Sequence, residues 1–298
     1  MLEIKNISKS YGKLKAVDNL SFTVNEGEIF GLLGVNGAGK TTTFRLINRL
    51  ITQDGGTILL DGEPITYDVT DKIGFVPEER SLLPKLTVFE QAIYYGVLKG
   101  MKEKEIEKQL DHWLDRFEIP DYKNRKIKEL SKGNQQKIQL IVAVLHNPKL
   151  LILDEPFSGL DPINTELFTN VIRELSSIGT AIIFSSHRME HVEEFCQKLV
   201  ILLKGKAVLE GDLKDIKEKY RKKNIIIQGD VDLKELKKID GVIEINETDK
   251  IEVKIKDNDT VDKVFKYVSK CSNITKFAVE EPSLNEIFVS KVGESYEE

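Results

Sequence analysis

The chain has 298 residues, of which 40% are hydrophobic and 31% charged, and its formal net charge is −5 with a pI of about 5.7. This composition is typical of a soluble globular protein of about two domains, and its acidic balance argues against DNA or RNA as the main partner. The longest apolar stretches, such as 199–203, are far shorter than the roughly 18 residues of a membrane-spanning helix, and Cys196 and Cys271 lie far apart, which favours reduced thiols.

The first 60 residues predict short antiparallel strands. Apolar and polar residues alternate over 2–7, 16–24 and 56–60, as in half-buried strands, and turns that contain Gly separate these segments. Between them lies the apolar run 29–33, which is followed at once by Gly-Val-Asn-Gly-Ala-Gly-Lys-Thr at 34–41.

A strand, a Gly-rich turn and a helix in this order are typical of a loop that binds a polyphosphate. The glycines suit a backbone with positive φ that approaches its ligand closely. Lys40 would reach the β- and γ-phosphates, and the hydroxyl of Thr41 would bind Mg²⁺. A flexible Gly-rich hairpin is the alternative, but the helix expected from Lys40 favours nucleotide binding. The residues expected to bind the nucleotide here are Gly34, Val35, Asn36, Gly37, Ala38, Gly39, Lys40, Thr41 and Thr42.

A helical block is expected at about 87–145. Thr87 and Glu90 form a capping box, in which each side chain satisfies a free N–H at the start of a helix. A second helix begins near Lys102, and Pro120 closes it. The residues spaced to bury one face of this second helix are Ile106, Leu110, Trp113, Leu114 and Phe117. Because the block interrupts an alternating α/β pattern, the sequence indicates an inserted helical subdomain.

Alternating strands and helices then return. Strands are expected at 150–153, which is buried, and at 181–185 and 198–203, with helices at 164–177 and 189–197 between them. The predicted fold class is therefore α/β, a doubly wound layer with an antiparallel edge.

Two carboxylates, Asp154 and Glu155, follow the first of these strands. Near a phosphate loop, Asp154 can hold Mg²⁺ and Glu155 can orient a water for attack on a γ-phosphate. The alternative is a strand that simply ends in a charged turn. The four aliphatic residues before the pair, together with the upstream phosphate loop, favour the chemical interpretation.

The segment 216–224 is charged and is expected to link two domains. Its basic residues predict a solvated helix face, with contact to a membrane surface as the alternative. The remaining residues, 225–298, follow a β-α-β-β-α-β order with one further helix, which predicts a small α+β domain of the ferredoxin-like, split βαβ type. No Gly-rich loop, metal-ligand spacing or nucleophile pattern lies in it, so a regulatory or dimer-stabilising role is expected.

The stretch Leu-Ser-Lys-Gly-Asn-Gln-Gln-Lys at 130–137 precedes a helix expected at 138–145. It resembles the signature motif of ATP-binding cassette (ABC) proteins, whose usual form is Leu-Ser-Gly-Gly-Gln. The resemblance covers residues 1–215, and its motifs come in the family order. It implies a P-loop NTPase cassette, with a mixed sheet, helices and a helical subdomain, that binds ATP and Mg²⁺.

The resemblance also implies roles for single residues. Tyr11 occupies the aromatic position that stacks on adenine, and Val17 the apolar position that accompanies it. Ser131 and Gly133 are the signature residues that the family uses against the γ-phosphate bound by the opposing protomer. The signature departs from its usual form at two other positions, where Lys and Asn replace Gly and Gln.

Three further positions matter for the site. Asp161 lies in the loop after the acidic pair, and His187 follows a strand as the family's switch histidine, catalytic together with Glu155. Glu78 stands where the family's Mg²⁺-binding loop usually has Gln; its carboxylate can still coordinate Mg²⁺ but adds negative charge near the γ-phosphate. These variants, and the stretch Glu-Pro-Ser-Leu-Asn-Glu-Ile-Phe at 281–288, resemble bacterial exporter ATPases of the sodium-efflux and drug-efflux type.

The sequence therefore predicts an ATP-hydrolysing subunit that energises an export transporter. The resemblance implies a homodimer or pseudo-dimer that sandwiches two ATP and docks on separate membrane permease subunits at the cytoplasmic face of the cell membrane. Sodium ion and drugs or peptides are candidate substrates, but selectivity lies in the permease chains. The rival is a soluble cassette protein acting on ribosomes or nucleic acid, although such proteins usually carry two cassettes or a basic arm. A regulator without turnover is disfavoured by Glu155 and His187.

An apolar cluster of Leu82, Leu83 and Leu86 beside Pro84 lies close to Glu78 in the sequence. In the family, the groove that receives the permease lies in this region, so the cluster is expected to accept a short helix from a partner. The alternative is that these leucines pack inside the protein.

Overall fold

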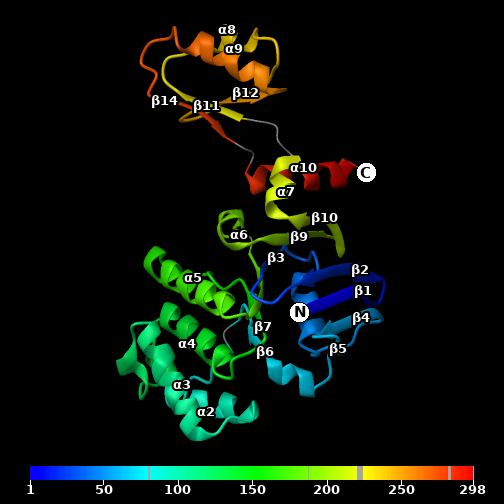
Figure 1. Ribbon diagram of the computed structural model, residues 1–298, viewed down its shortest axis with the longest axis vertical. Helices are drawn as coiled ribbons and strands as arrows, with labels where there is room; N and C mark the ends of the chain where they lie inside the picture. The colour runs from blue at the N-terminus through cyan, green and yellow to red at the C-terminus, as the bar shows by residue number, and fades with distance from the viewer. Residues whose placement is uncertain (80, 187, 220–223, 281–282, 298) are drawn as a thin grey trace. The chain divides into compact units, whose positions relative to one another are not determined.

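The computed structural model describes residues 1–79, 81–186, 188–219, 224–280 and 283–297. The chain divides into two compact units, Met1–Gly211 and Asp212–Glu298 (Figure 1). Among the described residues of both units, no helix is long and apolar enough to cross a membrane.

The first unit begins with an antiparallel sheet of strand order β2-β1-β4-β5. Its strands are β1 (Leu2–Tyr11), β2 (Leu14–Val24), β4 (Gly55–Leu60) and β5 (Glu63–Pro64). Leu2 pairs with Val24 on one side and with Leu60 on the other. Since successive side chains of a strand point to opposite faces, Leu2 and Ile4 are buried while Glu3 between them is not.

A six-stranded sheet forms the centre of this unit, in the order β10-β9-β3-β8-β7-β6. Its strands are β3 (Ile29–Gly34), β6 (Ile73–Val76), β7 (Leu150–Asp154), β8 (Ala181–Ser185), β9 (Lys198–Leu203) and β10 (Lys206–Asp212). Strands β3 and β6 to β9 run parallel, so their carboxyl ends meet at one edge. Every residue of β3, β7 and β8 is buried, which explains their continuous apolar sequences.

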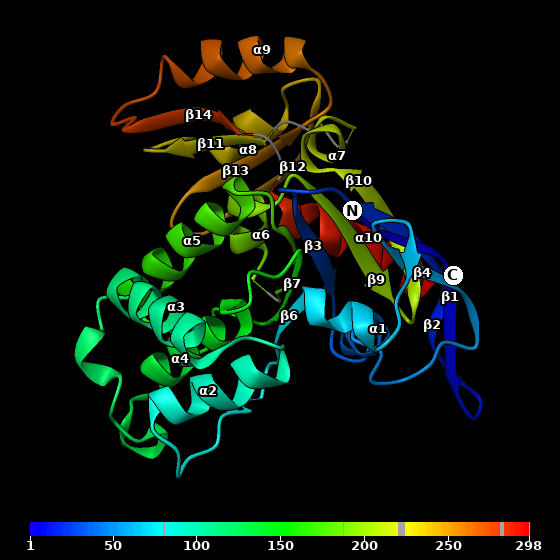
Figure 2. The same cartoon turned by 60° about the horizontal axis from the view of Figure 1, so that its bottom comes forward.

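Helices cover both faces of the six-stranded sheet. Helix α1 (Lys40–Ile47) packs in a core shared with the antiparallel sheet, where Phe44 meets side chains of both sheets. Helices α4 (Lys132–Val144), α5 (Pro162–Ser177) and α6 (Met189–Phe195) lie on the side away from β1 and β2, as Figure 1 and Figure 2 show. A 3₁₀ turn, η1 (Asp68–Lys72), leads into β6. This arrangement confirms the predicted α/β cassette.

The helical block contains α2 (Val88–Leu98) and α3 (Glu103–Arg116), followed by the 3₁₀ turns η2 (Pro120–Tyr122) and η3 (Ile127–Glu129). The capping box of Thr87 and Glu90 is confirmed, and the residues expected on the inner face of α3 are buried. Helix α4 begins at Lys132, earlier than the expected 138–145, because the hydroxyl of Ser131 caps its first turn.

The second unit contains a four-stranded antiparallel sheet of order β12-β13-β11-β14. Its elements are α7 (Leu213–Lys219), β11 (Asn224–Gln228), α8 (Leu233–Lys237), β12 (Val242–Glu247), β13 (Ile251–Ile255), α9 (Asn258–Val268), β14 (Lys276–Glu280) and α10 (Leu284–Glu297). The strand order confirms the split βαβ arrangement. Leu236 of α8 and Val264 of α9 pack against Ile225 and Val253 of the sheet.

Two expected segments of the second unit coincide only in part with described elements. Residues 213–219, which include the start of the expected linker, form helix α7. Residues 220–223, with part of the basic run, and 281–282, from the exporter-like stretch, lie outside the described residues.

Candidate active site

The phosphate loop connects the buried strand β3 to helix α1, as predicted. Gly34, Gly37 and Gly39 have φ angles of 150°, 80° and 110°, which L side chains rarely adopt. A Cβ on Gly34 would lie 2.5 Å from the carbonyl oxygen of Leu202, and one on Gly39 would lie 2.3 Å from that of Ala16. The loop therefore needs glycine at these two positions both for its conformation and for its close packing on neighbouring strands.

Lys40 is the first residue of α1, and it is only 8% exposed. Its Nζ donates to the carbonyl oxygens of Gly34, at 2.7 Å, and Val35, at 3.3 Å. The ammonium group therefore lies inside the loop, at the positive end of the α1 dipole. Phosphate oxygens would accept stronger, charge-assisted bonds from it than neutral carbonyl groups do. The geometry suits a phosphate-binding lysine.

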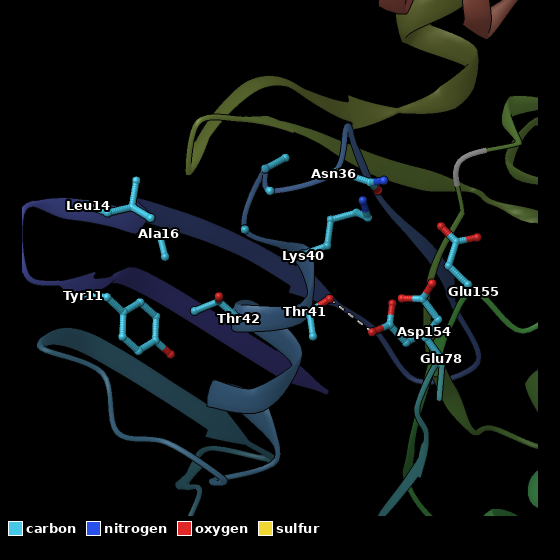
Figure 3. A pocket seen from close by; sticks show the side chains of 13 residues that line it. Tyr11, Leu14, Ala16, Asn36, Lys40, Thr41, Thr42, Glu78, Asp154 and Glu155 are labelled. Carbon is cyan, nitrogen blue, oxygen red and sulfur yellow. Dashed lines mark hydrogen bonds between the residues drawn. The ribbon is translucent and has the colours of Figure 1, made fainter. Parts of the chain in front are cut away.

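Asp154 ends β7 and is 2% exposed. Its Oδ1 accepts a hydrogen bond from Oγ of Ser185 at 2.6 Å, and its Oδ2 accepts from Oγ1 of Thr41 at 3.4 Å (Figure 3). Ser185 stands opposite Asp154 in the pairing of β7 with β8, so the sheet register supplies this donor. The bond from Thr41 is long and weak, and it leaves Oδ2 able to bind a cation.

Glu155 follows Asp154 and has a φ of 50°. This left-handed conformation is uncommon for a residue with a side chain and costs about 1–3 kcal/mol. The backbone N–H of Glu155 donates to Oγ of Ser185 at 3.0 Å, which stabilises the turn. The same hydroxyl group thus holds both acids at the carboxyl edge of the sheet.

These residues surround one cavity of about 530 Å³, a size typical of small-molecule sites. The described residues that line it are Tyr11, Leu14, Ala16, Asn36, Gly37, Ala38, Gly39, Lys40, Thr41, Thr42, Glu78, Asp154 and Glu155. Figure 3 shows Tyr11 at one end of the cavity and the three carboxylates at the other, with Lys40 and Thr41 between them. Gly34 and Val35 contribute to the site through the carbonyl oxygens that hold Lys40.

Tyr11 ends β1 and is 48% exposed, so one face of its ring is open to the cavity. Nζ of Lys9 lies 5.9 Å from the ring centroid, and Asp54 accepts a hydrogen bond from this Nζ at 2.8 Å. A tyrosine held in this way offers a flat surface on which a base can stack.

Val17 does not line the cavity, contrary to the expectation from the sequence. Its side chain is completely buried in the core between the two sheets. Because side chains alternate along β2, the neighbouring Ala16 and Leu14 face the cavity instead. The alternation of β2 separates these two residues from Val17, but the alternation alone does not say which face of the strand meets the core.

The donor atoms at the carboxylate end suit Mg²⁺, which prefers oxygen ligands. The hydroxyl of Thr41 and the carboxylate of Asp154 already lie within 3.4 Å, and Figure 3 shows the carboxylate of Glu78 beside them. Among the described residues, no three His, Cys, Asp or Glu side chains gather into a metal site. Mg²⁺ is commonly held by one or two carboxylates together with phosphate oxygens, so these residues would hold an ion that arrives with a nucleotide.

The signature residues lie outside this cavity. Ser131 caps α4, and Gly133 lies in the first turn of that helix. Asp161 caps α5 by accepting a hydrogen bond from the backbone N–H of Asn164 at 2.9 Å, and this bond holds the pKa of Asp161 below its usual value. His187 is outside the described residues.

Known proteins are similar to this chain in sequence and in fold. The family model described as ABC transporter matches residues 17–158, and the one described as ATP-binding protein DrrA1-3-like, C-terminal domain, matches residues 211–292. The chain is 51% identical to the uncharacterized ABC transporter ATP-binding protein YhaQ of Bacillus subtilis over 298 residues, the full length of both. It is 36% identical to the linearmycin resistance ATP-binding protein LnrL of Bacillus subtilis, over 72% of this chain and 70% of the relative. It is 38% identical to the Nod factor export ATP-binding protein I of Sinorhizobium fredii, over 70% and 62%.

Solved structures of ATP-binding cassettes also match this chain. The structure of an ATP-binding subunit of an ABC transporter matches with a TM-score of 0.70 and 31% identity, over 74% of this chain and 93% of that chain. The ATP-binding cassette MJ0796, in a dimeric post-hydrolysis state bound to ADP and Pi, matches with a TM-score of 0.65 and 26% identity, over 72% and 99%. The chain therefore belongs to the ATP-binding subunits of ABC transporters, a family of cassettes that bind and hydrolyse ATP.

Proposed function

We propose that this subunit energises an export transporter through ATP-driven closure and reopening of a pair of cassettes. The observation that carries this proposal is the gathering of Lys40, Thr41, Asp154 and Glu155 around one cavity at the carboxyl edge of the sheet. The direction of transport is supported by relatives whose names refer to Nod factor export and to linearmycin resistance.

In this mechanism, different residues bind the base, the phosphates and the metal ion of ATP, and one residue activates the attacking water. The base stacks on Tyr11, and Lys40 with the loop N–H groups binds the phosphates. Thr41 and Asp154 would hold Mg²⁺, which would supply charge neutralisation at the phosphates. Glu155 accepts a proton from the attacking water as that water forms a bond to the γ-phosphorus; the bond from this phosphorus to the bridging oxygen breaks, giving ADP and phosphate.

The position of the signature supports a pair of cassettes. Ser131 and Gly133 do not line the cavity of their own chain, so they are free to contact the γ-phosphate held by a second ATPase subunit. ATP would then join the two subunits, and hydrolysis would release them. The second subunit is a copy of this chain or a related one.

A second cavity, of about 570 Å³, is the groove proposed to receive the permease. It lies between β6 and the helical block, with Pro77, Leu82 and Tyr95 among its lining residues. Of the three leucines expected to form a docking cluster, Leu82 lines this groove but is nearly buried. Leu83 is 41% exposed, and Leu86 is half-buried. Leu83 therefore presents most of the exposed apolar surface of this cluster.

The polar groups of the groove indicate which chemical groups a partner needs in order to bind there. Arg49 and Lys99 are cationic, His146 is neutral at pH 7 because burial lowers its pKa to about 4, and no carboxylate is among the described lining residues. Gln139 is 3% exposed; its Nε2 donates to the carbonyl oxygen of Pro77 at 2.9 Å, and its buried Oε1 has no hydrogen-bond partner among the described residues. A short permease helix with an apolar face and an acidic side chain would complement the apolar and cationic parts of this groove.

The substitution Glu155→Gln tests the proposed function. It keeps the shape of the side chain but removes the base, so ATP should still bind while turnover falls by roughly 10²-fold or more. Dimer should accumulate in the presence of ATP on size exclusion. Glu103→Gln, on the exposed side of α3, serves as the control. Near-normal hydrolysis by Glu155→Gln would exclude Glu155 as the residue that activates the water.

The second candidate, a soluble cassette protein acting on ribosomes or nucleic acid, is disfavoured because the chain belongs to the ATP-binding subunits of ABC transporters. It is separated from the first by sedimentation of the protein expressed with its permease. Recovery with membranes is expected; recovery with ribosomes or DNA and none with membranes would favour the second candidate.

A further inference from the structure

Glu78 brings a third carboxylate to the phosphate end of the ATP cavity. Strands β6 and β7 run parallel with Val76 opposite Leu153, so the segments that follow them leave the sheet side by side. Glu78 therefore reaches the same edge as Asp154 and Glu155. Figure 3 shows its carboxylate next to that of Asp154, and all three acids line the cavity.

The described residues that line this cavity include more carboxylates than cations. Among the described lining residues, Lys40 is the one cation, and it already donates to two carbonyl oxygens of the loop. A triphosphate brings several more negative charges to the same place. Without a metal ion, the carboxylates repel the phosphates; with a divalent cation between them, Glu78 and Asp154 become ligands of that cation.

We infer that Glu78 restricts this cavity to nucleotide that carries a divalent cation. The inference rests on the proposed ATP site and names the form of nucleotide which that site accepts. A glutamine at this position would offer an oxygen to the ion but no negative charge, so it would discriminate less against metal-free nucleotide. By linkage, the factor by which Mg²⁺ strengthens nucleotide binding must equal the factor by which nucleotide strengthens Mg²⁺ binding.

The test compares nucleotide affinity with and without Mg²⁺. Binding of a non-hydrolysable, imido-bridged ATP analogue to the purified full-length chain is measured by titration calorimetry, in Mg²⁺ and in EDTA at one ionic strength. In the unsubstituted chain, Mg²⁺ should tighten binding by well over tenfold. In Glu78→Gln this factor should shrink by about tenfold, an estimate that allows for solvent screening of an exposed side chain. With ADP, which lacks the γ-phosphate, the change should be smaller.

Two further variants separate the charge of Glu78 from a general effect on the loop. Glu79→Gln removes an equally exposed neighbouring charge that does not line the cavity, and it should behave as the unsubstituted chain does. Glu78→Asp keeps the charge on a shorter side chain. It should still exclude the metal-free analogue while its half-saturating Mg²⁺ concentration rises several-fold. Thermal unfolding curves of all variants show whether each one is folded.

The outcomes distinguish this inference from the proposed function. The inference is wrong if folded Glu78→Gln shows the same factor between Mg²⁺ and EDTA as the unsubstituted chain, or if the unsubstituted chain binds the analogue equally well in both. In either case the ATP site itself stands. If the unsubstituted chain binds the analogue in neither condition, the ATP site proposed above is wrong as well.

Discussion

The side chain of Ser185 holds two neighbouring acidic residues in place. Its hydroxyl donates to Asp154 and accepts from the N–H of Glu155, so it fixes a buried carboxylate and a left-handed turn together. Neither acid would be held as well by its own strand, because β7 ends between them. The roles proposed for Asp154 and Glu155 in ATP hydrolysis thus depend on Ser185, which belongs to the adjacent strand β8.

Substitution of Lys40 should lower ATP affinity, whereas substitution of His187 should lower turnover. Lys40→Ala removes a charged donor from the phosphates, so ATP affinity should fall by about 100-fold, from the loss of two charge-assisted hydrogen bonds. His187→Ala, at a position that family resemblance assigns to the γ-phosphate, should leave affinity within a few-fold and lower turnover. Equilibrium binding and steady-state hydrolysis measure the two effects. Lys104→Ala, on the exposed side of α3, is the control.

Loss of affinity without loss of turnover per bound ATP in His187→Ala would remove the histidine from its proposed catalytic role. Unchanged affinity in Lys40→Ala would show that the loop N–H groups bind the phosphates without help from the lysine.

At the scale of elements, His146 near the end of α4 should make the free energy of unfolding depend on pH. His146 follows this helix, with Nε2 3.3 Å from the carbonyl oxygen of Ile73. Burial, and then the charge of Lys99, lower its pKa from 6.5 to about 4; the bond to Ile73 and the charge of Asp71 oppose this only in part. Between these two pKa values the unfolded chain binds a proton that the folded chain does not. Stability should therefore fall as pH drops from 6.5 towards 4, by up to about 3 kcal/mol.

Urea unfolding between pH 7.5 and 5 measures this dependence. Fluorescence of Trp113, the one tryptophan of the chain, reports the unit that contains His146. His146→Asn should lose less stability on acidification than the unsubstituted chain, whereas His112→Asn, on the exposed side of α3, should not differ from it. Parallel pH dependence in all three proteins would show that His146 is not the group responsible.

Elements that rest on local signals could be predicted from the sequence. The capping box before α2, the buried face of α3 and the split βαβ order of the second unit are all carried by periodicity or spacing within one segment. The start of α4 was placed too late because its apolar run begins only at Ile138, whereas Ser131 decides where the helix starts. The phosphate loop was equally clear because its motif is contiguous.

Contacts between segments that carry no recognisable motif could not be predicted. Ala16 rather than Val17 faces the ATP cavity, and this depends on which face of β2 meets the core. The groove brings together Lys99 after α2, Gln139 inside α4 and His146 beyond it, residues that belong to no motif. Such sites become visible only when the packing of several elements is known.

At the scale of the whole first unit, one short segment joins its two cavities. Pro77 lines the groove and the adjacent Glu78 lines the ATP cavity. Gln139 lines the groove and holds Pro77 through its side-chain amide, so an occupant of the groove that displaces Gln139 acts directly on this segment. Binding in the groove and binding of nucleotide can thus influence each other through two consecutive residues.

Docking on the permease should therefore depend on both the apolar and the cationic parts of the groove. Leu83→Asp places a charge on the exposed leucine next in sequence to Leu82, which lines the groove, and Lys99→Glu reverses a charge that is 25% exposed and lines it. Each should reduce the share of the protein recovered with membranes that contain the co-expressed permease, by about tenfold, because an apolar contact or a charge pair becomes unfavourable. ATP binding should be retained, since neither residue lines the ATP cavity.

Matched controls exist on the same helical block. Val97→Asp changes an apolar residue that is 56% exposed on α2, and Lys104→Glu reverses an exposed charge on α3; neither residue lines the groove. Both should leave membrane recovery unchanged. If Leu83→Asp alone prevents recovery, the groove binds an apolar segment without an acidic partner. If neither groove variant differs from its control, the permease docks on another surface. Pro77 and Glu78 then do not connect permease docking to nucleotide binding.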